Sequence, residues 1–324
     1  MRAWQVTELG EPTEVLQLVE VDDPTPRAGN VVIDIKACGL KFPDLLQIRG
    51  GYQVKPKLPF TPGGEIAGVI SAVGDGVTSV AVGDRVLVMG NGGLAEKVEF
   101  PAAACFPIPD AMSFEHAACL LTNYGTTVFA LDDRAHLQPG ETMLVTAAAG
   151  GVGSSAIQVG KAMGANVIGL AGGPDKVKTV LDLGADAAFD YKEVDVVEAV
   201  RAATDGRGVD VCYEAVGGDI FDQVRRTMAW DGRLLVIGFT SGRIPEAPAN
   251  HLLLKNYSIV GVHWGASLDR DPSALRRGWD RICELYATGH IDPLIDAVRP
   301  LDEAVAALDD LDNRRTKGKV VIAP

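Results

Sequence analysis

The stretch VTAAAGGVGSSAIQVGKAMGANVIGLAGG, residues 145–173, decides the fold of this chain. Its first residues are apolar and predict a strand that ends at Thr146, and glycines follow at positions 150, 151 and 153. Small apolar residues at helical spacing then predict a helix to about Met163, and a second strand ends near Ala171. The whole stretch therefore predicts one strand–helix–strand unit, the setting in which a glycine-rich turn binds a dinucleotide.

The glycine positions of this turn fit a pyrophosphate site. Ala148, Gly150 and Gly153 have the spacing of the three small residues of a dinucleotide-binding turn, with alanine in the first place. Small side chains let the backbone N–H groups approach the pyrophosphate, and the amino end of the helix adds partial positive charge. Gly151 and Val152 complete the predicted site. The alternative is a tight turn that serves only packing.

The end of the second strand indicates which dinucleotide binds. NAD-specific sites place an acid there to bind the ribose 2′-hydroxyl, whereas this chain has Ala171. Gly172 leaves room for a 2′-phosphate, Lys176 supplies positive charge, and Tyr191 follows the next predicted strand with a hydroxyl donor. NADPH is therefore the predicted cofactor. The alternative is NAD with Asp175 as the acid, although Asp175 lies beyond Pro174 and inside the predicted helix.

Strand spacing divides the chain into two kinds of structure. After about residue 140, apolar strands alternate with helical segments, which is typical of a doubly wound parallel (Rossmann) sheet. Before about residue 120, short β-type runs alternate with Gly, Pro and Asp turns and predict a mostly antiparallel β domain. A length of 324 residues also favours two domains. The predicted strands are 31–37, 65–73, 85–89 and 95–100, then 142–146, 166–170, 187–189, 209–213, 233–237 and 258–262.

Composition excludes several classes of protein. A formal net charge of −13 argues against binding to nucleic acid or to an anionic membrane, because both need clustered Lys and Arg. The opening residues MRAWQVTELG lack a secretion signal, so a cytoplasmic protein is expected. The uncharged window 142–160 contains four glycines, and we interpret it as strand, turn and helix rather than a membrane span. The five cysteines show no CxxC spacing and are expected to be free thiols.

Several motifs resemble one family along nearly the whole chain. They are LPFTPGGEIAGVISAVGDGV (58–77), VGDRVLVMGNGGLAEKV (82–98), AAAGGVG (147–153), VDVCYEAVGG (209–218), LLVIGF (234–239) and GKVVI (318–322). Together they resemble the zinc-independent, ζ-crystallin-like NADPH:quinone oxidoreductases of the medium-chain dehydrogenase/reductase superfamily. The resemblance implies a GroES-like β-rich catalytic domain (1–124 and 266–324), a Rossmann domain (125–265) and a cleft at their junction.

The resemblance also implies further contacts and partners. It implies that Thr127, Gly238 and Phe239 contact the cofactor, Thr127 or its neighbour Thr126 at the nicotinamide ribose. His263 and Trp264 are expected in the cleft or, alternatively, at a dimer edge. It implies a homodimer formed through edge strands of the cofactor sheets, here around residues 258–264. The expected substrate is a small quinone or conjugated enone.

Two departures concern metal. Lys41 stands where zinc-dependent relatives have a cysteine, and Gly63-Gly64-Glu65 replaces their Gly-His-Glu. A four-cysteine lobe is also missing, so no metal site is expected. A cation at Lys41 is expected to stabilise charge on the substrate oxygen, and Tyr52 to hydrogen-bond it. The alternatives are a salt bridge from Lys41 to Asp44 or Glu65, and a purely packing role for Tyr52.

Two other functions remain open from sequence. An enoyl-CoA or acryloyl-CoA reductase would share the fold and the hydride step, but it needs a basic path for the CoA phosphates. The sequence offers one short basic cluster, Arg314, Arg315 and Lys317, which is alternatively a solvated loop. The third possibility is a crystallin-like protein that binds NADPH without turnover.

Overall fold

The computed structural model describes residues 1–53, 55–268, 270–271 and 273–324. It divides into two compact units, Met1–Thr122 with Pro293–Pro324, and Asn123–Asp292. The sequence predicted that residues 266–292 belong to the β-rich domain, whereas in the structure they belong to the second unit. The end of this segment is bound to α4 (Gly151–Ala162), because the side-chain amide of Gln158 donates to Asp292 O (2.7 Å) and accepts from Asp292 N (2.9 Å).

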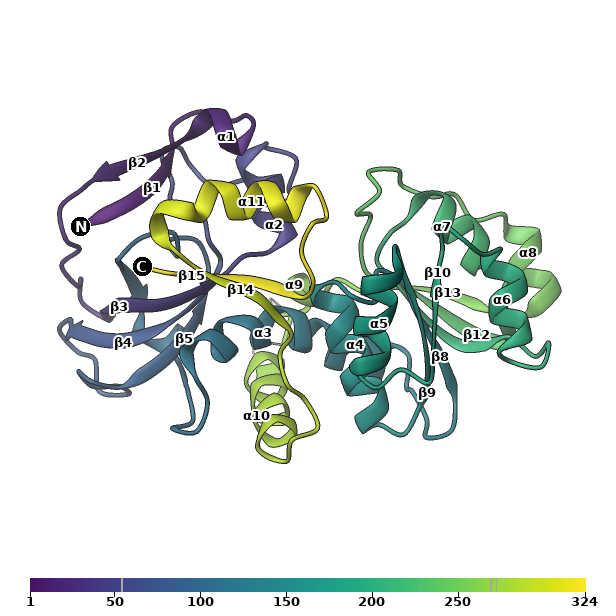
Figure 1. The fold of residues 1–324 in the computed structure, drawn as a ribbon. Helices are drawn as coiled ribbons and strands as arrows, with labels where there is room; N and C mark the ends of the chain where they lie inside the picture. Colours follow the sequence, from purple (N-terminus) through teal and green to yellow (C-terminus); the bar gives the residue numbers. More distant parts are fainter. Residues whose placement is uncertain (54, 269, 272) are drawn as a thin grey trace. The chain divides into compact units, whose positions relative to one another are not determined.

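The second unit is built on a six-stranded parallel sheet in the order β10-β9-β8-β11-β12-β13. Both β9 and β11 neighbour the first strand, β8, so the strand order reverses there, as in a Rossmann fold. Figure 1 shows α4 and α5 on one face of this sheet and α6, α7 and α8 on the other. The predicted doubly wound parallel sheet is confirmed. The bounds are β8 (Thr142–Val145), α4 (Gly151–Ala162), β9 (Asn166–Ala171), α5 (Pro174–Asp182), β10 (Ala187–Asp190), α6 (Val196–Ala202), β11 (Val209–Glu214), α7 (Gly218–Val224), β12 (Met228–Val236), α8 (Ala249–Lys255) and β13 (Ser258–Gly261).

Burial on both faces explains why the central strands are almost wholly apolar. Met143, Leu144 and Val145 of β8 are each 0% exposed, since helices cover both sides of a parallel sheet. The remaining elements of this unit are the end of α3 (Phe114–Val128), a π-helical turn (Phe129–Arg134), α9 (Trp264–Ser267) and α10 (Ser273–Ala287).

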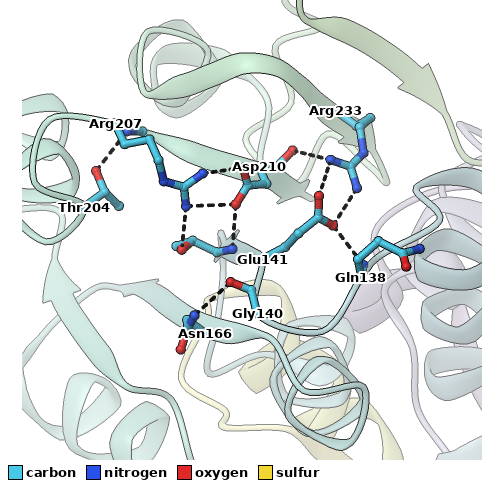
Figure 2. A network of polar contacts seen from close by, with 10 residues as sticks. Gln138, Gly140, Glu141, Asn166, Thr204, Arg207, Asp210 and Arg233 are labelled. Atoms are coloured by element: carbon cyan, nitrogen blue, oxygen red, sulfur yellow. Dashed lines mark hydrogen bonds and ion pairs between the residues drawn. The ribbon is translucent and has the colours of Figure 1, made fainter.

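A polar network holds the sheet at the edge where its strands begin (Figure 2). Arg233 donates two hydrogen bonds to the Glu141 carboxylate, at 2.9 and 2.7 Å. Asp210 accepts from Thr142 N (2.8 Å) and from Arg207 Nη2 (2.9 Å). Because these residues lie at the starts of β8 and β11 and within β12, they fix the strands at the edge opposite the glycine turn.

The first unit is a β-rich structure that contains both chain ends. Its larger sheet has the order β14-β15-β3-β4-β5-β7, with β6 also paired to β3, and β1 pairs with β2 in a separate ribbon. All pairs are antiparallel except β14 with β15. The bounds are β1 (Arg2–Val6), α1 (Pro12–Val15), β2 (Leu16–Glu20), β3 (Asn30–Gly39), α2 (Phe42–Ile48), β4 (Glu65–Val73), β5 (Arg85–Met89), β6 (Lys97–Pro101), β7 (Phe106–Pro107), β14 (Ile295–Pro300), α11 (Ala304–Asp312) and β15 (Lys319–Ala323), with 3₁₀ turns at Ala102–Ala104 and Leu301–Glu303.

This unit has two apolar clusters. One lies within the strands and includes Ile33, Ile66 and Val86. The other joins α2 to α11 through Leu45 and Leu308. The carboxyl-terminal segment is thus part of this unit's core rather than an appendage.

The uncharged window 142–160 forms β8, the glycine turn and most of α4, as interpreted from the sequence. Among the described residues, no helix combines the length and the apolar character needed to cross a membrane. All five cysteines are free, as expected.

Candidate functional site

The glycine turn lies at the carboxyl end of β8, where the strand order reverses. β8 ends at Val145, and α4 begins at Gly151 with Gly150 as its N-cap in extended conformation. The left-handed residue of this turn is Ala147, with a φ of 48°, and the turn closes when Gly150 N donates to Ala147 O at 2.8 Å. The turn therefore delivers the open amino end of α4 to the carboxyl edge of the sheet, where ligands bind in this kind of fold.

Gly153 shows why this turn requires small residues. A Cβ on Gly153 would overlap Ala147 O and lie 2.7 Å from Ala148 Cα, and both are backbone atoms that cannot move aside. A Cβ on Gly150 would lie 3.2 Å from Ala147 O. The first turn of α4 thus packs directly on the backbone of the preceding loop.

Glu214 is a residue of this region that the sequence analysis missed. It is 0% exposed at the end of β11, and its carboxylate accepts from Val216 N (2.8 Å), Gly217 N (3.0 Å) and Thr146 Oγ1 (3.3 Å). Burial raises the pKa of the Glu214 carboxyl, while these hydrogen bonds oppose the shift. Glu214 therefore ties the loop after β11 to the residue that begins the glycine turn. The sequence signal that could have identified Glu214 is an acidic residue at the end of an apolar strand.

The loop after β12 lies beside the loop after β11. Phe239 is 39% exposed, and a Cβ on Gly217 would lie 3.2 Å from its ring. Thr240 N donates to Ala215 O at 3.2 Å. The structure thus brings Gly238 and Phe239 to the same edge of the sheet as the glycine turn, and their cofactor contacts stay a prediction.

Gly172 and Tyr191 lie against each other after β9 and β10. A Cβ on Gly172 would lie 2.7 Å from the Tyr191 hydroxyl and 2.9 Å from its Cζ. Gly173, with a φ of 97°, caps α5, and its N–H donates to Asp190 Oδ2 at 2.9 Å. Lys176 lies in the first turn of α5. Gly172 and Tyr191 are therefore neighbours, and the binding of a 2′-phosphate by these two residues and Lys176 stays a prediction.

Thr127 lies in the interior. It is 0% exposed, and its hydroxyl contacts Ser155 Oγ at 2.8 Å and the Tyr213 hydroxyl at 3.1 Å, which joins α3 to α4 and β11. Its predicted contact with the nicotinamide ribose stays untested. Trp264 is 7% exposed and packs on Gly125, where a Cβ would lie 2.7 Å from its ring. It is therefore a core residue of this unit rather than an exposed aromatic.

Lys41 lies at the start of α2 in the first unit. It is half-buried, and its ammonium donates to Gly64 O at 3.1 Å. Its backbone N–H donates to Asp44 Oδ2 at 2.9 Å. Asp44 is 0% exposed, and burial raises the pKa of its carboxyl, with the charge of Lys41 acting in the opposite direction.

Tyr52 belongs to the same region of the first unit. The side chain is half-buried, and desolvation raises the pKa of its hydroxyl, with a further contribution from the negative charge of Asp44. Its phenolic O–H group can donate a hydrogen bond. Lys41 thus contacts the buried carboxyl group of Asp44, and the charge of Asp44 also acts on Tyr52.

Glu65 has a partner that the sequence analysis did not foresee. Lys319 of β15 donates to Glu65 Oε2 at 3.1 Å, with side chains 5% and 0% exposed. Thr122 N donates to Glu65 Oε1 at 2.8 Å. The carboxylate of Glu65, one of the two partners suggested for Lys41, is therefore paired with a lysine from the carboxyl-terminal strand.

Comparison with known proteins identifies the family. One family model, described as an alcohol dehydrogenase GroES-like domain, matches residues 27–110, and another, described as a zinc-binding dehydrogenase, matches residues 151–281. The quinone oxidoreductase-like protein 2 homolog of Nematostella vectensis is 43% identical over 327 residues, covering 99% of this chain and 88% of that protein. The chain belongs to the quinone oxidoreductase family of the medium-chain dehydrogenase/reductases.

Solved structures of the family agree along the full length. The Escherichia coli quinone oxidoreductase complexed with NADPH matches with a TM-score of 0.91 and 30% identity, covering 100% of both chains. A probable oxidoreductase from Mycobacterium abscessus matches with a TM-score of 0.90 and 38% identity, covering 100% of this chain and 99% of that one. The predicted family and the fold class, a Rossmann sheet with a GroES-like β-rich domain, are confirmed.

One member of the short basic cluster, Arg315, forms local ion pairs. Arg315 Nε donates to Asp310 Oδ1 at 2.6 Å, and Arg315 also pairs with Asp309. Lys317 N donates to Asp296 Oδ1 at 3.3 Å. The carboxylates of Asp309 and Asp310 offset the positive charge of Arg315, which a CoA phosphate would need.

Residues that commonly bind metals are dispersed in this family member. Across the described ranges, no three His, Cys, Asp or Glu side chains gather closely enough to hold a metal ion. Metal independence of the reaction stays a prediction.

Proposed function

We propose that this chain is an NADPH:quinone oxidoreductase that transfers a hydride from NADPH to a quinone or a conjugated enone without a metal. The observation that carries the proposal is the bare backbone turn at the amino end of α4, at the point where strand order reverses in the parallel sheet. The NADPH-complexed E. coli relative supports the choice of cofactor.

The residues of the second unit fit the proposed cofactor. Gly153 lets the first turn of α4 pack on the backbone of Ala147 and Ala148, and Gly172 lets the Tyr191 hydroxyl lie beside the end of β9, where a 2′-phosphate is proposed to bind. When bound, NADPH supplies the hydride. The residues proposed to hold it are Ala148, Gly150, Gly151, Val152 and Gly153 at the pyrophosphate, Gly172, Lys176 and Tyr191 at the 2′-phosphate, and Thr127, Gly238 and Phe239 toward the nicotinamide.

Lys41 and Tyr52 are the proposed catalytic residues. Reduction of a quinone or enone places negative charge on the acceptor oxygen, and a cation with a hydrogen-bond donor stabilises that charge. The Lys41 ammonium has three N–H donors, of which one is bound to Gly64 O. Tyr52 supplies a neutral phenolic O–H donor. These two side chains provide the stabilisation that a metal would otherwise supply.

The homodimer and the cytoplasmic location are also proposals. β13 is the edge strand of the six-stranded sheet, and α8, the helix that precedes it, carries Leu253 and Leu254, which are 80% and 71% exposed. An edge strand and exposed apolar side chains together support pairing of two identical chains.

One assay tests the function. NADPH oxidation is measured with simple quinones, with short enones and with enoyl-CoA esters, and with NADH in place of NADPH as the control. Fast oxidation with quinones or enones and slow oxidation with enoyl-CoA is expected. Faster turnover of enoyl-CoA would favour the thioester reductase, and tight NADPH binding without oxidation by any acceptor would favour the non-catalytic role.

A further inference from the structure

Two adjacent glycines in the first unit exclude a side chain for different reasons. Gly63 has a φ of 91°, and its Cβ would lie 2.8 Å from Leu94 N, so the backbone itself requires glycine there. Gly64 is not among the residues with positive φ. A Cβ on Gly64 would instead overlap the ammonium of Lys41 and lie 2.5 Å from its Cε. The Lys41 side chain, rather than backbone conformation, fills the space beside Gly64.

The carboxyl group of Asp44 lies beside this space. Its carboxyl group is 0% exposed, and Oδ2 is bound by Lys41 N at 2.9 Å. Oδ1 is buried without a hydrogen-bond partner and would lie 3.4 Å from a Cβ on Gly64. A nearby cation stabilises a buried carboxyl oxygen in this state, and the Lys41 side chain fills the neighbouring space beside Gly64.

We propose that Gly64 and Asp44 form a seat for the Lys41 ammonium, and that Gly64 is a positioning residue which fixes this cation for the acceptor oxygen. The inference rests on the proposed function, in which Lys41 stabilises charge on the acceptor. A cation held in place before the reaction stabilises developing charge without reorganising, whereas a mobile surface lysine does not.

Gly64→Ala tests whether this space holds the Lys41 ammonium in place. The atoms that an alanine methyl would meet belong to the end of a flexible side chain, so the ammonium moves away and the fold remains. We compare Gly64→Ala, Lys41→Met and the double variant, with Gly278→Ala of α10 as the matched control, because a Cβ there meets nothing within 4 Å. Turnover with a quinone, NADPH affinity and melting temperature are measured for each.

Gly64→Ala is expected to lower kcat about 10- to 100-fold, the range for loss of one hydrogen bond from a charged group, with unchanged NADPH affinity and melting temperature. In the Lys41→Met background it is expected to cause no further loss. Ethylammonium is expected to restore turnover to Lys41→Ala when residue 64 is glycine and not when it is alanine. Wild-type turnover of Gly64→Ala, or losses that multiply in the double variant, would overturn the seat.

A second measurement separates this inference from the proposed function. Acetylation of Lys41 by acetic anhydride is followed by mass spectrometry, with Lys192 as the internal reference, and needs no turnover. Gly64→Ala is expected to raise the Lys41 rate about 10-fold, and an unchanged rate would overturn the seat. If the wild-type protein fails to oxidise NADPH with any of the acceptors tested, the proposed function is wrong. The acetylation rates still show whether Gly64 and Asp44 hold the Lys41 ammonium.

Discussion

Gly153 shows most clearly why the glycine turn needs a residue without a side chain. Its Cα faces the backbone of Ala147 and Ala148, so any side chain at position 153 would push α4 away from the loop. The amino end of α4 would then be displaced from the site where the pyrophosphate is proposed to bind. A change at residue 153 is therefore expected to alter both local packing and cofactor affinity.

We expect Gly153→Ala to lower NADPH affinity at least about 100-fold. Overpacking at a site lined by backbone should also lower the free energy of unfolding by about 1–3 kcal/mol. Fluorescence titration with NADPH and urea denaturation measure the two effects. Gly278→Ala, where the added methyl meets open space, is the control and should retain NADPH affinity. Normal affinity in Gly153→Ala would contradict the proposed pyrophosphate site.

Lys176 is the residue proposed to distinguish NADPH from NADH. It lies in the first turn of α5, close in sequence to Gly172 and Gly173. We expect Lys176→Ala to weaken NADPH about 10-fold or more, the value of one charged hydrogen bond to phosphate, and to change NADH affinity little. Dissociation constants for both cofactors test this. Equal losses for both would place Lys176 away from the 2′-phosphate.

Asp44 is expected to make stability fall with rising pH. Burial raises the pKa of its carboxyl above the ordinary value of 3.8, so the unfolded chain releases this proton more readily than the folded protein. Stability is then lost as pH rises from the ordinary pKa through the raised one. Asp44→Asn removes this loss, and we expect its stability relative to wild type to increase between pH 4 and pH 7. Urea unfolding across this range is the measurement, and a difference that stays constant with pH would contradict it.

At the scale of elements, apolar periodicity predicted most of the strands. The bounds of β4 and β5 agree with the predicted ranges, because both strands are apolar and end at turn residues. β14 was not predicted. Its sequence IDAVRP alternates half-buried with exposed residues and contains no fully buried one, so it carries no apolar run. Strand pairing with β15, rather than composition, makes it a strand.

The glycine turn could be predicted because its residues are consecutive, whereas the partners that arrange the site are distant in sequence. Glu214 and Thr146 are 68 residues apart, and Lys319 and Glu65 are 254 residues apart. The space that Lys41 fills beside Gly64 depends on the path of two separate elements. No local pattern encodes such pairs, so the sequence suggested Lys41 but not its surroundings.

The network in Figure 2 yields a test of sheet anchoring. Arg233 and Glu141 form a two-point ion pair with side chains 21% and 22% exposed. We expect Glu141→Gln to lower the free energy of unfolding by about 1–3 kcal/mol, because the partly buried guanidinium loses its counter-charge. The exposed pair of Lys178 and Asp182 is the control, at 76% and 62% exposure. Asp182→Asn should change stability by less than about 0.5 kcal/mol. Equal effects in urea denaturation would contradict an anchoring role.

At the scale of the whole molecule, the chain combines an acidic net charge with a buried ion pair. The net charge of −13 keeps the surface acidic, while the buried pair of Glu65 and Lys319 joins the carboxyl-terminal strand to a strand near the amino end. The ion pair therefore makes the β-rich unit depend on both ends of the chain.

The exposed leucines of α8 allow a test of the proposed homodimer. Leu253 and Leu254 of α8 are 80% and 71% exposed, and no residue of α8 is buried, so these side chains add nothing to the core of a single chain. If they are covered by a second copy, replacing both with Glu should weaken the dimer at least about 10-fold and leave the unfolding of the monomer unchanged, since two carboxylates would be desolvated at the interface. Light scattering across a dilution series measures the effect. Val82→Glu, at a residue 60% exposed in the other unit, is the control. A dimer of unchanged affinity would mean that α8 lies outside the interface, and a monomeric wild type would overturn the proposed assembly.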